Sequence, residues 1–176
     1  DAQESRGLGD VYKRQVETRK EVKVLSRVEL TSEDQLADIR KYVKPIEARR
    51  MGKIMKSSLL SSLEALAQAG VDKPDAIITG TMYGCLEYSE RLLEQMKEEG
   101  EVMLKPTYFM QSTHNTIGSN IAIKTHCHGY NVTYTQGTAS LSWALRDAEM
   151  LLKEGKAKTC LLYTSDAADE LTHVDI

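Results

Sequence analysis

Residues 129–145, GYNVTYTQGTASLSWAL, constrain the fold of this chain more than any other stretch. β-Branched and aromatic residues come first, then the small and polar residues 136–140, then apolar residues at helical spacing. This order predicts a strand over 129–136 that turns sharply into a helix over 140–153. In α/β enzymes, a corner of this kind exposes one side chain at the end of the sheet and points a helix amino terminus at it. Nucleophiles are placed in this way.

The corner contains no cysteine, and its only hydroxyl groups are those of Thr138 and Ser140. Thr138 is a candidate nucleophile, but a secondary alcohol needs an adjacent general base, and the nearby sequence offers none. The amide of Gln136 is a candidate hydrogen-bond donor to a thioester or carboxylate oxygen. We favour a corner that is kept for packing after its chemistry was lost, and rank Gln136 as an oxygen-binding donor second.

Strands and helices alternate along the rest of the chain. This alternation predicts an α/β layered fold, with a mixed or mostly parallel sheet flanked by helices. Trp143 and the leucines beside it are expected in the core. The other expected elements are a strand over 21–30, a segment that Pro45 ends, a helix over 49–69 capped by Gly70, a buried parallel strand over 75–79, an amphipathic helix ending at Gly100, an irregular stretch over 106–113 and a helix over 115–123.

Composition excludes several classes of protein. The 176 residues have room for one domain or part of one, and 41% hydrophobic with 28% charged residues is ordinary for a globular protein. A net charge of −3 without a basic stripe argues against nucleic-acid binding. No apolar run approaches the roughly 20 residues that span a bilayer. Of the three cysteines, Cys160 lies in an end segment that is considered separately below, and Cys85 and Cys127 are too few for a disulfide framework, which favours a cytoplasmic location.

The turn over 80–84, GTMYG, follows a predicted strand and precedes a predicted helix. Phosphate-binding loops occur at such turns, but this one has neither the spacing of a dinucleotide fingerprint nor the lysine of a P-loop. We therefore interpret the glycines as permitting a close turn, and predict no cofactor.

His126, Cys127 and His128 form the most plausible metal-binding cluster. If they lay on a strand, His126 and His128 would face the same side and could share an ion. A structural zinc site needs four ligands, however, and no spacing selects the others, so we predict no metal site. Cys127 as a nucleophile is a further alternative, because flanking histidines can lower the pKa of a thiol. It precedes the strand and so lies away from the corner.

Both ends of the chain resemble translated transposase adapters of sequencing libraries. DVYKRQ at 10–15 and CLLYTS at 160–165 can be encoded by DNA strands that are reverse complements, apart from a shift of one base in frame. Two unrelated protein termini have no physical reason to share that relation. We therefore predict adapter-derived segments over 1–15 and 160–176, with a natural domain fragment over 16–159.

The domain resembles the N-terminal half of the β-ketoacyl synthases, which have the thiolase fold. The resemblance covers residues 48–159 and is most specific from Asn115 onwards. Ser119 departs from it, since the family usually has glycine there. The matching residues are Arg49 to Met51, Gly80, Thr81, Gly84, Asn115, Ile121 to Ile123, Gly129, Asn131, Ala144, Leu145 and Gly155.

The segments PTYFMQSTHNTIG and TQGTASLSWAL resemble a narrower group of ketosynthase-like proteins. These proteins lack the active-site cysteine and accompany aryl polyene and flexirubin-type pigment pathways, where they are likened to chain length factors. The resemblance places Thr138 at the position of the family cysteine and Gln136 two residues before it. The two catalytic histidines of the family belong to a C-terminal half outside this match, so the resemblance implies a truncated thiolase-like fold.

The resemblance implies a β-ketoacyl-[acyl carrier protein] synthase-like protein of bacterial fatty acid or polyketide-type biosynthesis. It further implies a non-catalytic partner of an active ketosynthase, acyl chains carried on acyl carrier protein as substrate, and a dimer with a ketosynthase or with itself. One alternative is an active acyltransferase or condensing enzyme that uses Cys127 or Thr138. The other is a small metal-binding module at His126 and His128.

Overall fold

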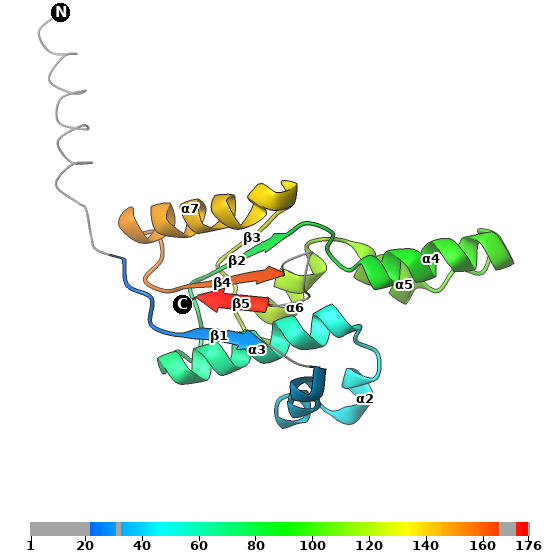
Figure 1. Ribbon diagram of the computed structural model, residues 1–176, viewed down its shortest axis with the longest axis horizontal. Coiled ribbons are helices and arrows are strands. Elements are labelled where there is room, and N and C mark those ends of the chain that lie inside the picture. The colour runs from blue at the N-terminus through cyan, green and yellow to red at the C-terminus, as the bar shows by residue number, and fades with distance from the viewer. Residues whose placement is uncertain (1–21, 31–32, 166–171, 176) are drawn as a thin grey trace, which may run out of the picture.

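The computed structural model describes residues 22–30, 33–165 and 172–175. At its centre is a five-stranded sheet with the order β1-β5-β4-β2-β3 (Figure 1). Strand β2 lies between β3 and β4 and is parallel to both, whereas β5 is antiparallel to β4 and to β1. The strands span Arg27–Leu30 (β1), Ala76–Thr81 (β2), Tyr130–Tyr134 (β3), Cys160–Ser165 (β4) and Thr172–Asp175 (β5).

Helices cover both faces of this sheet. Helices α3 and α6 pack on one face and α7 packs on the other (Figure 1). The sheet therefore separates two apolar clusters, as in other layered α/β folds. The helical segments are η1 (Glu33–Lys41), α2 (Pro45–Ala48), α3 (Lys53–Ala69), α4 (Leu86–Glu99), α5 (Pro106–Ser112), α6 (Thr116–Thr125), η2 (Gly137–Ala139) and α7 (Ser140–Lys153), of which η1 and η2 are 3₁₀ turns.

The parallel strands contribute side chains to both clusters in strict alternation. Ile77 and Leu161 belong to the cluster under α3 and α6, whereas Ile78 and Leu162 belong to the cluster under α7. Every residue of β2 is buried. A strand buried on both faces has no need of polar residues, which explains the short apolar run from which it was predicted.

The predicted fold class is confirmed, and so are most of the predicted elements. Strand β2 is parallel and buried, α6 matches the helix expected over 115–123, and α7 has the predicted bounds. Gly70 ends α3 in the left-handed conformation, with φ of 66°. The apolar stripe of α3 packs in the larger cluster, as expected of an amphipathic helix on a sheet.

The prediction of an irregular stretch over 106–113 is wrong, because Pro106 begins α5. The segment before Pro45 does end, at Lys41, and Pro45 then begins α2. The first turn of a helix has backbone N–H groups without intrahelical partners, so a residue without an N–H is tolerated there. The sequence interpretation used Pro45 only as the end of a segment and gave Pro106 no role, although both prolines start helices.

The first strand and the first long helix are shorter than predicted. Strand β1 begins at Arg27, and Val22 and Val24 are exposed, so the alternation over 21–30 marks a buried face only at Val28 and Leu30. Helix α3 begins at Lys53, with Gly52 as its N-cap in an extended conformation.

The prediction that Trp143 and its neighbouring leucines belong to the core is also wrong. Trp143 is 48% exposed, and Leu141 and Leu145 are exposed to a similar degree. Helix α7 instead turns small residues, including Ala144 and Ala148, towards the sheet. A helix with apolar residues on its inner and its outer side is typical of one that is covered on both sides.

Helices α4 and α5 project away from the sheet as an arm (Figure 1). The buried side chain of Gln95 joins them. Its amide nitrogen donates to the Met103 carbonyl at 3.2 Å and to Glu99 at 2.7 Å, and its oxygen accepts the backbone N–H of Lys105 at 3.0 Å. A single buried amide thus fixes the loop between the two helices.

The two end segments fall differently within the structure. Residues 1–15 lie outside the described residues, whereas Cys160–Ser165 forms β4 between β2 and β5. The adapter origin of both segments stays a prediction, since pairing in a sheet does not depend on the source of a sequence. Within the described residues, no helix is long and apolar enough to cross a membrane.

Replacing Ser62 by alanine is expected to stabilise the fold. Ser62 lies within α3 and is fully buried, and its hydroxyl oxygen has no hydrogen-bond partner among the residues that the structure describes. A buried polar atom without a partner is costly, and alanine has the higher helix propensity, so the free energy of unfolding should rise by about 1 kcal/mol. Urea denaturation followed by circular dichroism measures the change.

Ser61→Ala is the matched control, because the Ser61 hydroxyl donates to the Ser57 carbonyl at 2.8 Å. Its loss of a hydrogen bond should offset the gain in helix propensity. A Ser62→Ala protein less stable than the parent would show that the Ser62 hydroxyl has a partner.

Asp75 makes the stability of the fold depend on pH. Its carboxylate accepts the backbone N–H groups of Lys158 at 2.8 Å and Thr159 at 3.1 Å, and these bonds hold its pKa below the ordinary value. A carboxyl group with a lowered folded-state pKa stabilises the fold above its unfolded pKa, and this stability is lost as pH falls through the folded pKa.

Asp75→Asn should therefore lower the free energy of unfolding at pH 7, by an amount that shrinks as pH falls below about 4. The exposed Asp72, replaced by asparagine in the same way, is the control and should change little. An Asp75→Asn effect that is equal at pH 7 and pH 3 would contradict this assignment.

Candidate functional site

The corner after β3 forms as predicted, at the carboxyl end of the parallel strands. Strand β3 ends at Tyr134, η2 covers Gly137–Ala139, and α7 begins at Ser140. The Ala139 N–H donates to the Gln136 carbonyl at 3.2 Å, which closes the turn. The carboxyl ends of parallel strands are where α/β folds place their ligands, so this is the candidate functional site.

The amino terminus of α7 docks on the end of β2. The hydroxyl of Ser140 donates to the Gly137 carbonyl at 2.7 Å and lies 3.2 Å from the Thr81 carbonyl of β2. Gly80 permits this approach, because a Cβ atom there would lie 3.1 Å from the backbone carbonyl carbon and oxygen of Ser140. Ser140 is only 3% exposed, so its hydroxyl positions the helix and is not available to a substrate.

A second close approach sets the start of β3. A Cβ atom on Gly129 would lie 1.9 Å from the Asp75 carbonyl oxygen at the start of β2. No side chain fits there, which gives a physical reason for the glycine that the family resemblance notes at this position. Strands β2 and β3 are then paired in register up to the corner, from Ala76 with Tyr130 to Gly80 with Tyr134.

Thr138 and Gln136 are both exposed at the corner. In the described part of the chain, neither side chain forms a hydrogen bond or an ion pair, and no general base contacts the Thr138 hydroxyl. Thr138 therefore lacks the partner that a hydroxyl nucleophile needs. The amide of Gln136 is free to donate to a ligand, as the sequence interpretation proposed.

The three cysteines are all buried and free. Burial raises the pKa of Cys85 to about 11, with a smaller contribution from the charge of Glu87. Burial, followed by the charge of Asp147, raises the pKa of Cys160 to about 12. Cys127 is 7% exposed and lies in the connection from α6 to β3, at the end of the strand away from the corner. None of these thiols occupies the position of a nucleophile at the corner.

His126 and His128 do not lie on a strand, contrary to the arrangement considered for a shared metal ion. His126 caps α6 in the left-handed conformation, with φ of 52°, and His128 precedes β3, which begins at Tyr130. Both side chains are exposed. Among the residues that the structure describes, no three His, Cys, Asp or Glu side chains are grouped to hold a metal ion.

Sequence reasoning located the corner but missed what holds it in place. The sequence interpretation considered Ser140 as one of the hydroxyl groups of the corner, and Gly80 only as a glycine that permits a close turn. In the structure, the two residues form the contact between α7 and β2. The signal was present in part. A glycine near the end of one buried strand, and a serine at the start of a helix that follows another, together indicate a close crossing.

The sequence matches the family described as beta-ketoacyl synthase, N-terminal domain, over residues 24–174. The chain belongs to this family. A comparison with curated proteins gives no match.

Solved structures with the same fold include a ketosynthase in complex with its chain length factor from Xenorhabdus doucetiae. It has a TM-score of 0.67 at 15% identity, over 89% of this chain and 78% of that one. The ishigamide ketosynthase/chain length factor has a TM-score of 0.65 at 18% identity, over 84% of this chain and 54% of that one. A beta-ketoacyl synthase from Burkholderia phymatum STM815 has a TM-score of 0.55 at 21% identity, over 76% of this chain and 32% of that one. The fold is that of the ketosynthases, and the resemblance to chain length factors noted in the sequence recurs among these structures.

A thiol placed at the corner should be reactive where the native thiols are not. A free thiol has a pKa of about 8.5, and a helix amino terminus lowers it. We therefore expect Thr138→Cys to react with iodoacetamide at pH 7 at least several-fold faster than Leu145→Cys, which places a half-exposed thiol in the middle of α7. Mass spectrometry of the alkylated peptides gives both rates.

The parent protein is the baseline, and its buried Cys85, Cys127 and Cys160 should be labelled slowly in the native state. Equal rates for Thr138→Cys and Leu145→Cys would show that the corner has no influence on a nucleophile.

Proposed function

We propose that this chain is part of a non-catalytic, chain-length-factor-type subunit that pairs with an active β-ketoacyl synthase. The observation that carries the proposal is the exposed Thr138 at the corner, where the family resemblance places a cysteine. A threonine without a base cannot form the acyl-enzyme on which ketosynthase condensation depends. The buried cysteines do not compensate, since none reaches the corner.

The edge of the sheet supports pairing with a second subunit. Within the described residues, β3 has a strand neighbour only on the side of β2. Exposed strand edges are templates for another chain. Ile123 on the adjacent α6 is 70% exposed and Tyr130 on β3 is 40% exposed. A ketosynthase or a second copy of this chain is the proposed partner, in line with the ketosynthase and chain length factor complexes of similar fold.

The proposed substrate of the assembly is an acyl chain carried on acyl carrier protein. Its setting is bacterial fatty acid or polyketide-type biosynthesis of the aryl polyene or flexirubin kind, in the cytoplasm. In this role the subunit shapes the site of its partner and performs no covalent step. Gln136 is proposed as a donor to an oxygen of the bound thioester or acyl chain.

Reconstitution with acyl carrier protein tests the proposal. The chain alone, incubated with acyl- and malonyl-carrier proteins, should give no condensation product and no acyl mass increment. A cysteine-bearing ketosynthase from the same source should copurify with this chain. The product distribution of that ketosynthase should change when the chain is omitted. An acyl increment on Thr138 or Cys127 would instead support the active acyltransferase, and no association with any ketosynthase would contradict the subunit role.

A charge placed beside the β3 edge should weaken association. Ile123→Glu puts a carboxylate on an exposed apolar position of α6, next to β3, where association would have to desolvate it. We expect at least a roughly tenfold weaker association, which corresponds to about 1.4 kcal/mol. Sedimentation velocity over a concentration series measures it, both for self-association and with the ketosynthase.

Ile46→Glu is the matched control, since Ile46 is 65% exposed on α2. It should leave association unchanged. Equal effects of the two substitutions would mean that the edge of β3 is not the contact surface.

A further inference from the structure

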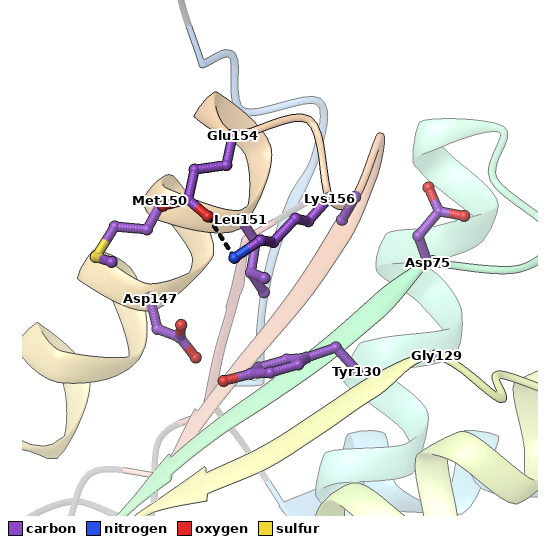
Figure 2. A pocket seen from close by; sticks show the side chains of 9 residues that line it. Asp75, Gly129, Tyr130, Asp147, Met150, Leu151, Glu154 and Lys156 are labelled. Atoms are coloured by element: carbon purple, nitrogen blue, oxygen red, sulfur yellow. Dashed lines mark ion pairs between the residues drawn. The ribbon is translucent and has the colours of Figure 1, made fainter. Parts of the chain in front are cut away.

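A cavity of about 370 Å³ lies at the end of the sheet away from the corner. It opens between the carboxyl-terminal part of α7 and the amino-terminal ends of β2 and β3 (Figure 2). Asp75 and Tyr130 line it from the strands, and Asp147, Met150 and Glu154 line it from α7 and its end. Because β2 and β3 run from this cavity towards the corner, the two sites are separated by the length of the strands.

Asp147 is the distinctive group in this cavity. Its Oδ2 atom is buried and has no hydrogen-bond partner among the described residues. Figure 2 shows its carboxylate pointing towards the phenol of Tyr130. The phenols of Tyr130 and Tyr134 hydrogen-bond with this carboxylate, but they bring no positive charge to it. A partly buried carboxylate that no cation compensates is costly, and a cation in the cavity would reduce that cost.

The phenols beside Asp147 do not add negative charge. Burial, followed by the neighbouring Asp147, raises the pKa of Tyr130 to about 12 and also raises the pKa of Tyr134. Both side chains therefore keep their protons at neutral pH. Their rings remain available as π faces, which attract cations.

The charges that line the cavity leave an excess of negative charge. Asp75 is engaged by the N–H groups of Lys158 and Thr159, and Glu154 is paired with Lys156 at 2.6 Å (Figure 2). Among the described residues, Asp147 has no positively charged partner, and its hydrogen-bonding neighbours are the uncharged phenols of Tyr130 and Tyr134. The cavity also adjoins the carboxyl end of α7, where the helix dipole favours a cation.

We propose that this cavity binds an alkylammonium or alkylguanidinium group, with its positive head on Asp147 and its alkyl stem on Met150 and Leu151. The carboxylate supplies the opposite charge, the ring of Tyr130 supplies a π face, and the two apolar side chains cover the stem. Two sources carry this chemistry: a free amine, and a lysine or arginine side chain of a partner chain.

Ligand-observed NMR titration with n-butylguanidinium and n-butylammonium tests the site, and n-butylurea serves as the neutral control of similar shape. Both cations should bind saturably, and more weakly at high salt because the attraction is electrostatic. Asp147→Asn, which keeps the shape of the side chain, should lower their affinity at least roughly tenfold. Asp72→Asn removes an exposed carboxylate elsewhere and should leave it unchanged.

Lys156→Gln gives a test of opposite sign that does not depend on the folding of the Asp147 variant. It removes the positive charge that competes for the cavity and frees Glu154, so cation affinity should rise about threefold. Equal binding of n-butylurea and the cations, or unchanged binding in Asp147→Asn, would overturn the proposal.

Sedimentation of the Asp147→Asn variant separates the two sources. Loss of cation binding with unchanged association assigns the cavity to a free amine. Loss of both assigns it to a basic side chain of the partner. The amine titration needs no ketosynthase, so its result stands apart from that of the proposed subunit role.

Discussion

The docking of α7 on the end of β2 is the contact on which the rest of the structure depends. The Ser140 hydroxyl lies against the Thr81 carbonyl of β2, and Gly80 has no side chain to keep the two elements apart. The amino terminus of α7 can therefore approach the backbone of β2 closely. This contact sets the height of α7 over the sheet. The small residues of its inner face can then pack closely on β2 and β4, and the corner is held at the carboxyl end of β3. A larger residue at position 80 would displace α7, the small residues of its inner face and the corner.

Much of this arrangement could be predicted because it rests on local patterns. A buried apolar run gives β2, a left-handed glycine gives the end of α3, and the change from strand to helix pattern gives the corner with the correct bounds for α7. The alternation of strands and helices predicted the layered fold, and the family resemblance added that the layers are those of a thiolase-like fold. Strand order is a property of pairing between distant segments, and no local pattern encodes the position of β4 between β2 and β5.

The errors have a common physical origin. The helix that Pro106 begins was missed because a proline can end or begin a helix, and only the cap geometry separates the two. Trp143 was expected in the core, yet α7 packs closely on the sheet largely through small residues such as Ala144 and Ala148. The cavity around Asp147 was invisible for another reason. Its members come from β2, β3 and α7, and only the fold brings them together.

The pairing of β1 with β5 has a consequence for the order in which the chain can fold. These strands lie near opposite ends of the described sequence, and β5 is also the only link between β1 and the parallel strands. During synthesis, β2, β3 and the helices between them can find one another early, because their contacts are closer in sequence. Within the described residues, β1 joins the sheet only through β5, so it cannot pair until β4 and β5 are in place. Contacts of such long sequence separation are slow to form. Helix α3 is nearer in sequence and can cover the apolar side chains of β1, but it cannot pair with the backbone of the strand. Until β5 is in place, the backbone of β1 has no strand neighbour among the described residues, and an unpaired strand is a template for association with another chain.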